Sequence, residues 1–210
     1  MDIKVKHSWD DVTIGQYVML KSMETTDYPE LIDKGIFMID VIYGIDSKNI
    51  PYTQFNQLIN TLDFLGERPD SKKKKAQPSY KLNDTVYELD INYANFTTSQ
   101  FIDFTSYKKD NDEIGMLSSV LIPKGHDTYM EGYDIEKVKS DIEDYLSVTD
   151  AMAIINFFQV ASTRFMMHIL SYLRKKLTSR KMKKMSREQK EQITREIKKL
   201  QNIMELSLMS

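Results

Sequence analysis

The longest apolar stretch of the chain, residues 151–173, constrains the fold more than any other feature. A helix that spans a bilayer needs about 20 nearly unbroken apolar residues. Polar side chains interrupt this stretch at four positions: Asn156, Gln159, Arg164 and His168. The stretch therefore predicts no membrane span but a long, deeply buried helix of a soluble protein, over about residues 151–176, with Asp150 as its N-cap.

Shorter amphipathic helices are predicted in the rest of the chain. Thr13 and Gln16 have the spacing of a capping box, in which each side chain bonds the other residue's backbone N–H, so a helix should begin at Thr13. Apolar residues at helical spacing predict further helices over residues 28–43, 51–65 and 134–146.

Strand patterns are few. Residues 80–82 and 85–90 flank the polar turn Asn83-Asp84, which predicts a β-hairpin, and residues 3–6 alternate apolar and basic side chains as a short edge strand does. The expected fold class is mainly α (α+β): a helical body with a small β-hairpin and long C-terminal helices.

The first helix pattern recurs later in the chain at an offset of 84 residues. Three residues align with three others: Trp9, Thr13 and Gln16 with Tyr93, Thr97 and Gln100. Downstream, residues 36–42 resemble residues 116–122, and a glycine precedes each segment. An internal duplication is one interpretation, and two helices that begin with the same cap is the other.

These patterns divide the chain into four parts. Residues 1–66 form an N-terminal helical unit, and residues 67–78, rich in lysine with two prolines, form a linker. Residues 79–148 hold the hairpin and a helical unit, the proposed repeat of the first. Residues 149–210 hold the long helix, a basic segment and a terminal helix.

The net charge of −2 hides a strong asymmetry between an acidic body and a basic tail. Residues 174–210 carry 12 Lys and Arg against four acids, and the remaining 173 residues carry 17 against 27. Eight cations lie within residues 174–187, with no acid among them: Arg174, Lys175, Lys176, Arg180, Lys181, Lys183, Lys184 and Arg187. Such a run contacts either DNA phosphates, without reading sequence, or an acidic protein partner.

A terminal helix follows the basic run. Ser186 and Gln189 have the capping-box spacing, which predicts a helix from there to about residue 207. An apolar stripe lines one face at spacings of four, three and four: Ile193, Ile197, Leu200 and Met204. A narrow stripe of this kind packs on a partner helix or folds back on its own body.

Signs of catalysis are missing from the sequence. The chain has no cysteine, which excludes disulfides and thiolate chemistry, its seven glycines are scattered singly, and its three histidines lie far apart. The acidic cluster at residues 110–115 lacks the ligand pattern of a calcium loop and indicates a helix N-terminus instead. We therefore expect no enzyme, no metal and no cofactor. The thirteen methionines suit either a core or a surface that adapts to partners.

Three segments carry a resemblance to proteins of crAss-like bacteriophages: residues 121–125 with 131–138, residues 8–13, and residues 155–158. In the first, Leu-Ile-Pro-Lys-Gly is followed by Glu-Gly-Tyr-Asp-Ile-Glu-Lys-Val; the second reads Ser-Trp-Asp-Asp-Val-Thr, and the third Ile-Asn-Phe-Phe. The likeness covers most of residues 8–173 and contains no catalytic signature.

The resemblance implies a protein encoded with the virion and tail genes and assembled in the host cytoplasm. Its role would be a structural component of the tail or portal-neck region, present in the virion, or an assembly chaperone that is not retained there. The partners so implied are other copies of the chain and portal, tail or neck proteins, with an internal DNA-binding protein as a third alternative. The basic tail and terminal helix lie outside the matched residues.

Overall fold

The computed structural model describes residues 5–70, 74–92, 95–126 and 128–178, together with residues 186, 188, 189, 191, 194, 195 and 198. These residues fall into two compact units. The first lies within residues 1–91 and 96–155, and the second within residues 92–95 and 156–210. Each unit is described by itself.

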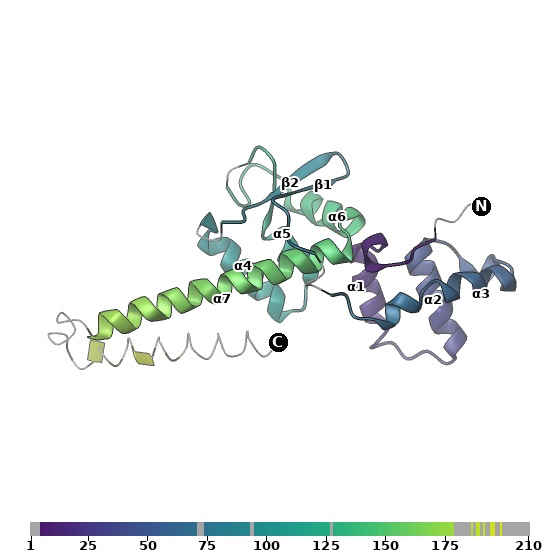
Figure 1. The fold of residues 1–210 in the computed structure, drawn as a ribbon, viewed down its shortest axis with the longest axis horizontal. Coiled ribbons are helices and arrows are strands. Elements are labelled where there is room, and N and C mark those ends of the chain that lie inside the picture. The colour runs from purple at the N-terminus through teal and green to yellow at the C-terminus, as the bar shows by residue number, and fades with distance from the viewer. Residues whose placement is uncertain are drawn as a thin grey trace. The chain divides into compact units, whose positions relative to one another are not determined.

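Within the described residues, helices dominate and one small sheet accompanies them (Figure 1). The helices are α1 Ile14–Ser22, α2 Leu31–Tyr43, α3 Tyr52–Asn60, α4 Thr98–Lys109, α5 Glu113–Ser118, α6 Ile135–Tyr145 and α7 Val148–Thr178. The strands β1 Ser79–Leu82, β2 Thr85–Leu89 and β3 Leu121–Pro123 form an antiparallel sheet in the order β1-β2-β3. The mainly α (α+β) fold class is therefore confirmed.

The predicted capping box at the start of α1 is confirmed. The backbone N–H of Gln16 donates to Thr13 Oγ1 at 3.3 Å, and the N–H of Thr13 donates to Gln16 Oε1 at 3.1 Å. The Gln16 amide also donates to the carbonyls of Val41 and Ile42 at 2.9 and 3.0 Å. One side chain thus caps α1 and satisfies two of the carbonyls that the end of α2 leaves unpaired.

The second capping box, at Thr97 and Gln100, is also present and starts α4. The alignment of residues 36–42 with 116–122 fails in structure, however. The first segment lies wholly in α2, whereas the second leaves α5 after Ser118 and enters β3, which pairs with β2. The two proposed repeats therefore share a helix start but differ in structure between residues 36–42 and 116–122.

The N-cap predicted for the long helix is wrong. The helix α7 begins at Val148, and Ser147 occupies the capping position. The N–H of Asp150 donates to Ser147 Oγ at 3.2 Å, and the Ser147 hydroxyl donates to Asp150 Oδ2 at 3.0 Å. Asp150 therefore lies inside the first turn, where its charge complements the helix dipole.

Other predicted elements differ only at their ends. The helix expected over residues 51–65 ends at Asn60 and continues as a turn and the 3₁₀-helix Asp63–Gly66. The hairpin forms as predicted, with Asn83 at φ 50° in its two-residue turn. Val5 and Lys6 of the expected edge strand have no regular structure, and the first two residues of that segment lie outside the described chain.

The N-terminal core joins α1, α2, α3 and the first turn of α7. Val12, Ile39, Ile42, Leu62 and Val148 are all at most 3% exposed and pack together there. The chain before α1 and the chain before α7 lie side by side, with mutual backbone hydrogen bonds. The Val148 N–H donates to the Val12 carbonyl at 2.8 Å, which holds the start of α7 in this core.

Of the described side chains of α7, buried ones extend from Val148 to Ala161, so the deep burial predicted for the whole helix does not hold along its full length. Ala151, Ala153, Ile154 and Ile155 are buried, whereas the later side chains Val160, Met167 and Tyr172 are 45%, 52% and 59% exposed. Among the described residues, no helix combines the length and apolar character that a bilayer span requires.

Candidate binding hollows around Trp9

Trp9 is the only tryptophan of the chain, and it lies in the 3₁₀-helix Trp9–Asp11 before α1. Its indole ring makes edge contacts with Tyr17 and Phe64 at centroid distances of 5.5 and 5.4 Å. The indole Nε1 donates to the backbone carbonyl of Glu67 at 2.9 Å. Trp9 is thus fixed between α1 and the segment that follows α3.

Two hollows of the first unit share Trp9 and Glu67 in their walls. The first, which we name the methionine hollow, has a volume of about 870 Å³. Three methionines from three elements line it, together with other apolar side chains: Met23, Met38, Met152, Tyr17, Leu20, Leu62 and Leu65. Because thioether side chains are flexible and polarizable, this lining suits an apolar group of irregular shape. Its rim carries Lys21, Glu24, Asp63 and Arg68.

The second hollow, which we name the acidic hollow, has a volume of about 750 Å³. It is lined by the hairpin, the last residue of α6, the first turn of α7 and the segment after α3. Its charged side chains are four carboxylates and two lysines: Asp10, Glu67, Asp70, Asp150, Lys74 and Lys81. The carboxylates outnumber the lysines, so this hollow favours cationic groups.

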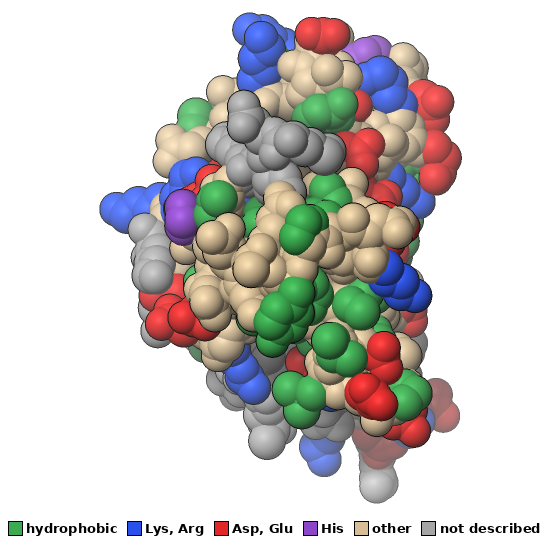
Figure 2. All heavy atoms as spheres, turned by 90° about the vertical axis from the view of Figure 1, so that its right-hand side faces the viewer, with side chains coloured by type: hydrophobic (Ala, Val, Ile, Leu, Met, Phe, Trp, Pro, Cys, Tyr) green, Lys and Arg blue, Asp and Glu red, His purple; other side chains and the backbone are tan. Residues whose placement is uncertain are grey.

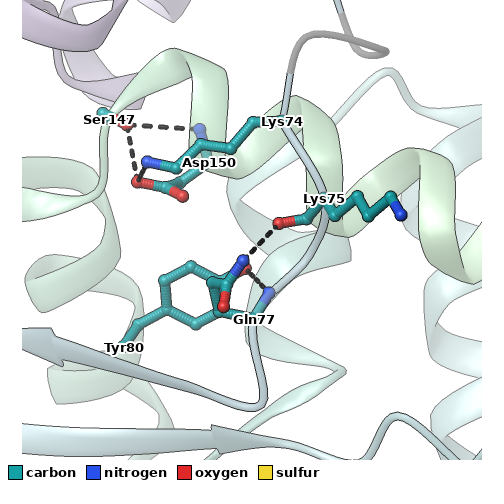
Figure 3. A network of polar contacts seen from close by, with 6 residues as sticks. All are labelled: Lys74, Lys75, Gln77, Tyr80, Ser147 and Asp150. Atoms are coloured by element: carbon teal, nitrogen blue, oxygen red, sulfur yellow. Dashed lines mark hydrogen bonds and ion pairs between the residues drawn. The ribbon is translucent and has the colours of Figure 1, made fainter.

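A polar network forms the floor of the acidic hollow (Figure 3). Lys74 Nζ lies 2.8 Å from Asp150 Oδ2, which also accepts the Ser147 hydroxyl. The other oxygen, Asp150 Oδ1, is buried and accepts no hydrogen bond from the residues that the structure describes. The Gln77 N–H donates to the Tyr80 hydroxyl at 2.7 Å, and burial raises the pKa of Tyr80 to about 12. Tyr80 is therefore neutral at pH 7. The Lys74–Asp150 pair connects the segment before the hairpin to the start of α7, and the Gln77–Tyr80 bond holds the turn that leads into β1.

A further buried polar cluster joins the sheet to α6. The Tyr87 hydroxyl donates to Asp141 Oδ2 at 2.6 Å, and Lys137 Nζ donates to the same oxygen at 2.7 Å. Burial raises the pKa of Asp141, but the hydrogen bonds from Lys137 and Tyr87 outweigh it and lower the pKa below its ordinary value. Tyr87 is 1% and Asp141 6% exposed, so the cluster links the sheet to α6 inside the protein.

Apolar side chains also lie open to solvent on α2 and α3. Leu31 is 90%, Ile32 49% and Tyr52 71% exposed. Figure 2 looks at the face that carries these helices and shows apolar side chains gathered among acidic ones. Where α2 crosses α3, Gly35 allows the approach, because a Cβ there would lie 3.2 Å from the side chain of Ile59.

Most residues of the predicted partner surface lie outside the described chain. This holds for the whole apolar stripe, Ile193, Ile197, Leu200 and Met204, and for Arg180, Lys181, Lys183, Lys184 and Arg187 of the basic run. Arg174, Lys175 and Lys176 lie in α7, where the Lys175 side chain is exposed and the other two side chains lie outside the description.

The start of the predicted terminal helix is described and confirmed. The Gln189 N–H donates to Ser186 Oγ at 3.3 Å, and the Ser186 N–H donates to Gln189 Oε1 at 3.2 Å. The described residues 188, 189, 191, 194, 195 and 198 are helical.

Sequence reasoning did not find the two hollows, because their walls come from segments far apart in the chain. The single tryptophan and the abundance of methionine were the available signals. Among the described residues, no three His, Asp or Glu side chains lie close enough together to hold a metal ion. The chain matches no protein-family model, no curated protein and no solved structure.

Proposed function

We propose that the chain is a non-enzymatic structural protein of a bacteriophage virion, in the tail or portal-neck region, and that it assembles with other copies through helical contacts. The resemblance of residues 8–13, 121–138 and 155–158 to crAss-like phage proteins supports the phage assignment. The assignment to an assembly protein is supported by the surface of the described body.

The observation that carries the proposal is the exposure of large apolar side chains on well-formed helices. Leu31, the first residue of α2, is 90% exposed, and Ile32 lies beside it. Side chains this exposed bury little apolar surface in the single chain. Val160 and Met167, seven residues apart on α7, are also about half exposed. Exposed apolar surface of this kind marks contacts between proteins.

In the proposed assembly, the C-terminal helix of one copy contacts the body of the next. Such a contact is heterologous, and it closes into a ring when the rotation between copies divides a full turn. The acidic body and the basic tail would attract each other across this contact, since they carry opposite charges of similar size.

Mass analysis of purified particles from the phage that encodes the chain tests the proposal. We expect the chain in purified and washed particles, at several copies for each portal assembly. If the chain is abundant in infected cells but missing from the particles, it is an assembly chaperone and the structural role is wrong. If the particles hold the chain only together with DNA and lose it after nuclease treatment, it is an internal nucleic-acid-binding protein.

A further inference from the structure

We propose that the methionine hollow and the acidic hollow together form the receptor for the C-terminal tail of a second copy of the chain. The inference deepens the proposed function and rests on it, because it names the surface of the body that the tail contacts.

The tail carries two kinds of side chain, cationic and apolar, and each kind suits one of the two hollows. The tail has a cationic half, residues 174–187, followed by an apolar half with the stripe from Ile193 to Met204. The body has one negative hollow and one apolar hollow, with Trp9 and Glu67 in the walls of both. The cationic half of the tail therefore complements the acidic hollow, and its apolar half complements the methionine hollow.

The methionine hollow fits the apolar stripe. Its floor consists of partly buried side chains that pack on the N-terminal core, among them Met38, Leu65 and Met152. Stripe residues spaced by three and four lie on one face of a helix, so several enter the same hollow from one side. Burial of each leucine or isoleucine there removes apolar surface from water on both partners.

The acidic hollow fits the cationic half. The Lys74 ammonium already pairs with Asp150 at 2.8 Å, and Asp10 and Glu67 add further negative charge to the lining. Several Lys and Arg side chains in such a hollow are attracted more strongly than in isolated surface ion pairs. The reason is that the walls of the hollow concentrate the negative electrostatic potential.

The two halves follow each other closely along the tail. The last cation of the run, Arg187, precedes the first stripe residue, Ile193, by six positions. Because Trp9 and Glu67 line both hollows, the hollows are neighbours, so one short segment can present its cations to one hollow and its apolar side chains to the other.

A mixing experiment with two variants of the full chain tests the inference. Met23→Lys places a charge in the methionine hollow, and Ile197→Asp places one in the stripe; the controls are Met19→Lys, on α1 but outside both hollows, and Gln192→Asp, beside the stripe. Each hollow or stripe variant alone should associate roughly 10- to 100-fold more weakly than the parent chain, as expected from the loss of one buried apolar anchor, whereas the controls should associate as the parent does.

The decisive result comes from equal mixtures of Met23→Lys and Ile197→Asp, measured by sedimentation velocity. The first variant still offers an intact tail and the second an intact hollow, so the mixture should form heterodimers and nothing larger. A second pair, Asp10→Lys with Glu67→Lys, reverses charge at exposed positions and should also weaken association, while Asp84→Lys with Glu88→Lys on the hairpin should not.

The outcomes separate the two proposals. If the parent chain assembles but Met23→Lys and the Asp10/Glu67 pair assemble equally well, the receptor is elsewhere and the inference is wrong, while the assembly function stands. If the mixture stays monomeric although each variant melts as a folded protein, the inference is also wrong. A parent chain that never associates overturns the proposed function itself.

Discussion

Asp141 is a buried carboxylate, and two hydrogen-bond donors stabilise its ionised form. Tyr87 and Lys137 both donate to its Oδ2, at 2.6 and 2.7 Å, and together they outweigh the burial that opposes ionisation. Since β2 carries the tyrosine and α6 carries the lysine, this single oxygen connects the sheet to the helix. We therefore expect the folded state to depend on the charge of Asp141.

The lowered pKa of Asp141 sets the direction of a pH effect. A carboxyl whose pKa is lower in the folded than in the unfolded state stabilises the fold fully above its unfolded pKa, about 3.9. That contribution is lost as the pH falls from there through the folded pKa. Asp141→Asn should lower the free energy of unfolding by about 1–3 kcal/mol at pH 7 and should flatten its dependence on pH below about 4.

Urea unfolding at a series of pH values measures this effect. Asp144→Asn provides the control, since Asp144 lies on the same helix and is exposed. Equal stability of Asp141→Asn and the parent chain at pH 7 would show that the carboxylate does not connect the sheet to α6.

At the level of helices and strands, local patterns were predictable and distant pairings were not. The capping boxes at Thr13 and Ser186 need only four consecutive residues each, and the hairpin needs only a turn, so all three were found. The cap of α7 was assigned to Asp150 although Ser147 and Asp150 have the same capping-box spacing. That pattern was available in the sequence and was missed.

The strand β3 illustrates what local patterns do not contain. Its first two residues, Leu121 and Ile122, were aligned with a segment of α2 in the proposed repeat. They become a strand because Leu121 and Ile122 pair with Leu89 and Glu88 of β2, more than thirty residues earlier. Tertiary pairing of this kind overrides local preference.

The capping box of α4 supplies a prediction at this level. Thr97→Ala removes the acceptor of the Gln100 N–H and should destabilise the protein by about 1 kcal/mol. Thr98→Ala, one residue later and equally exposed, replaces a helix residue outside the cap and should change stability by less than about 0.5 kcal/mol. Thermal unfolding of both variants decides the matter, and equal melting temperatures would mean that the cap contributes nothing.

For the molecule as a whole, the distribution of charge was predictable and the surface that uses it was not. The basic tail and acidic body follow from counting residues. The hollows bring Trp9 together with Met152 and with residues of the segment after α3, which requires the packed core. The candidate receptor therefore depends on the fold, whereas its candidate ligand is readable from the sequence.

We propose that separate copies of this chain bind one another through the tail. Native mass measurement of the full chain over a range of concentration and salt tests it most directly. We expect assemblies of several copies at low salt that dissociate as salt screens the basic tail from the acidic body. In Ile197→Asp, association should be roughly 10- to 100-fold weaker than in the parent chain at low salt. Single chains at every concentration, even at low salt, would contradict the claim.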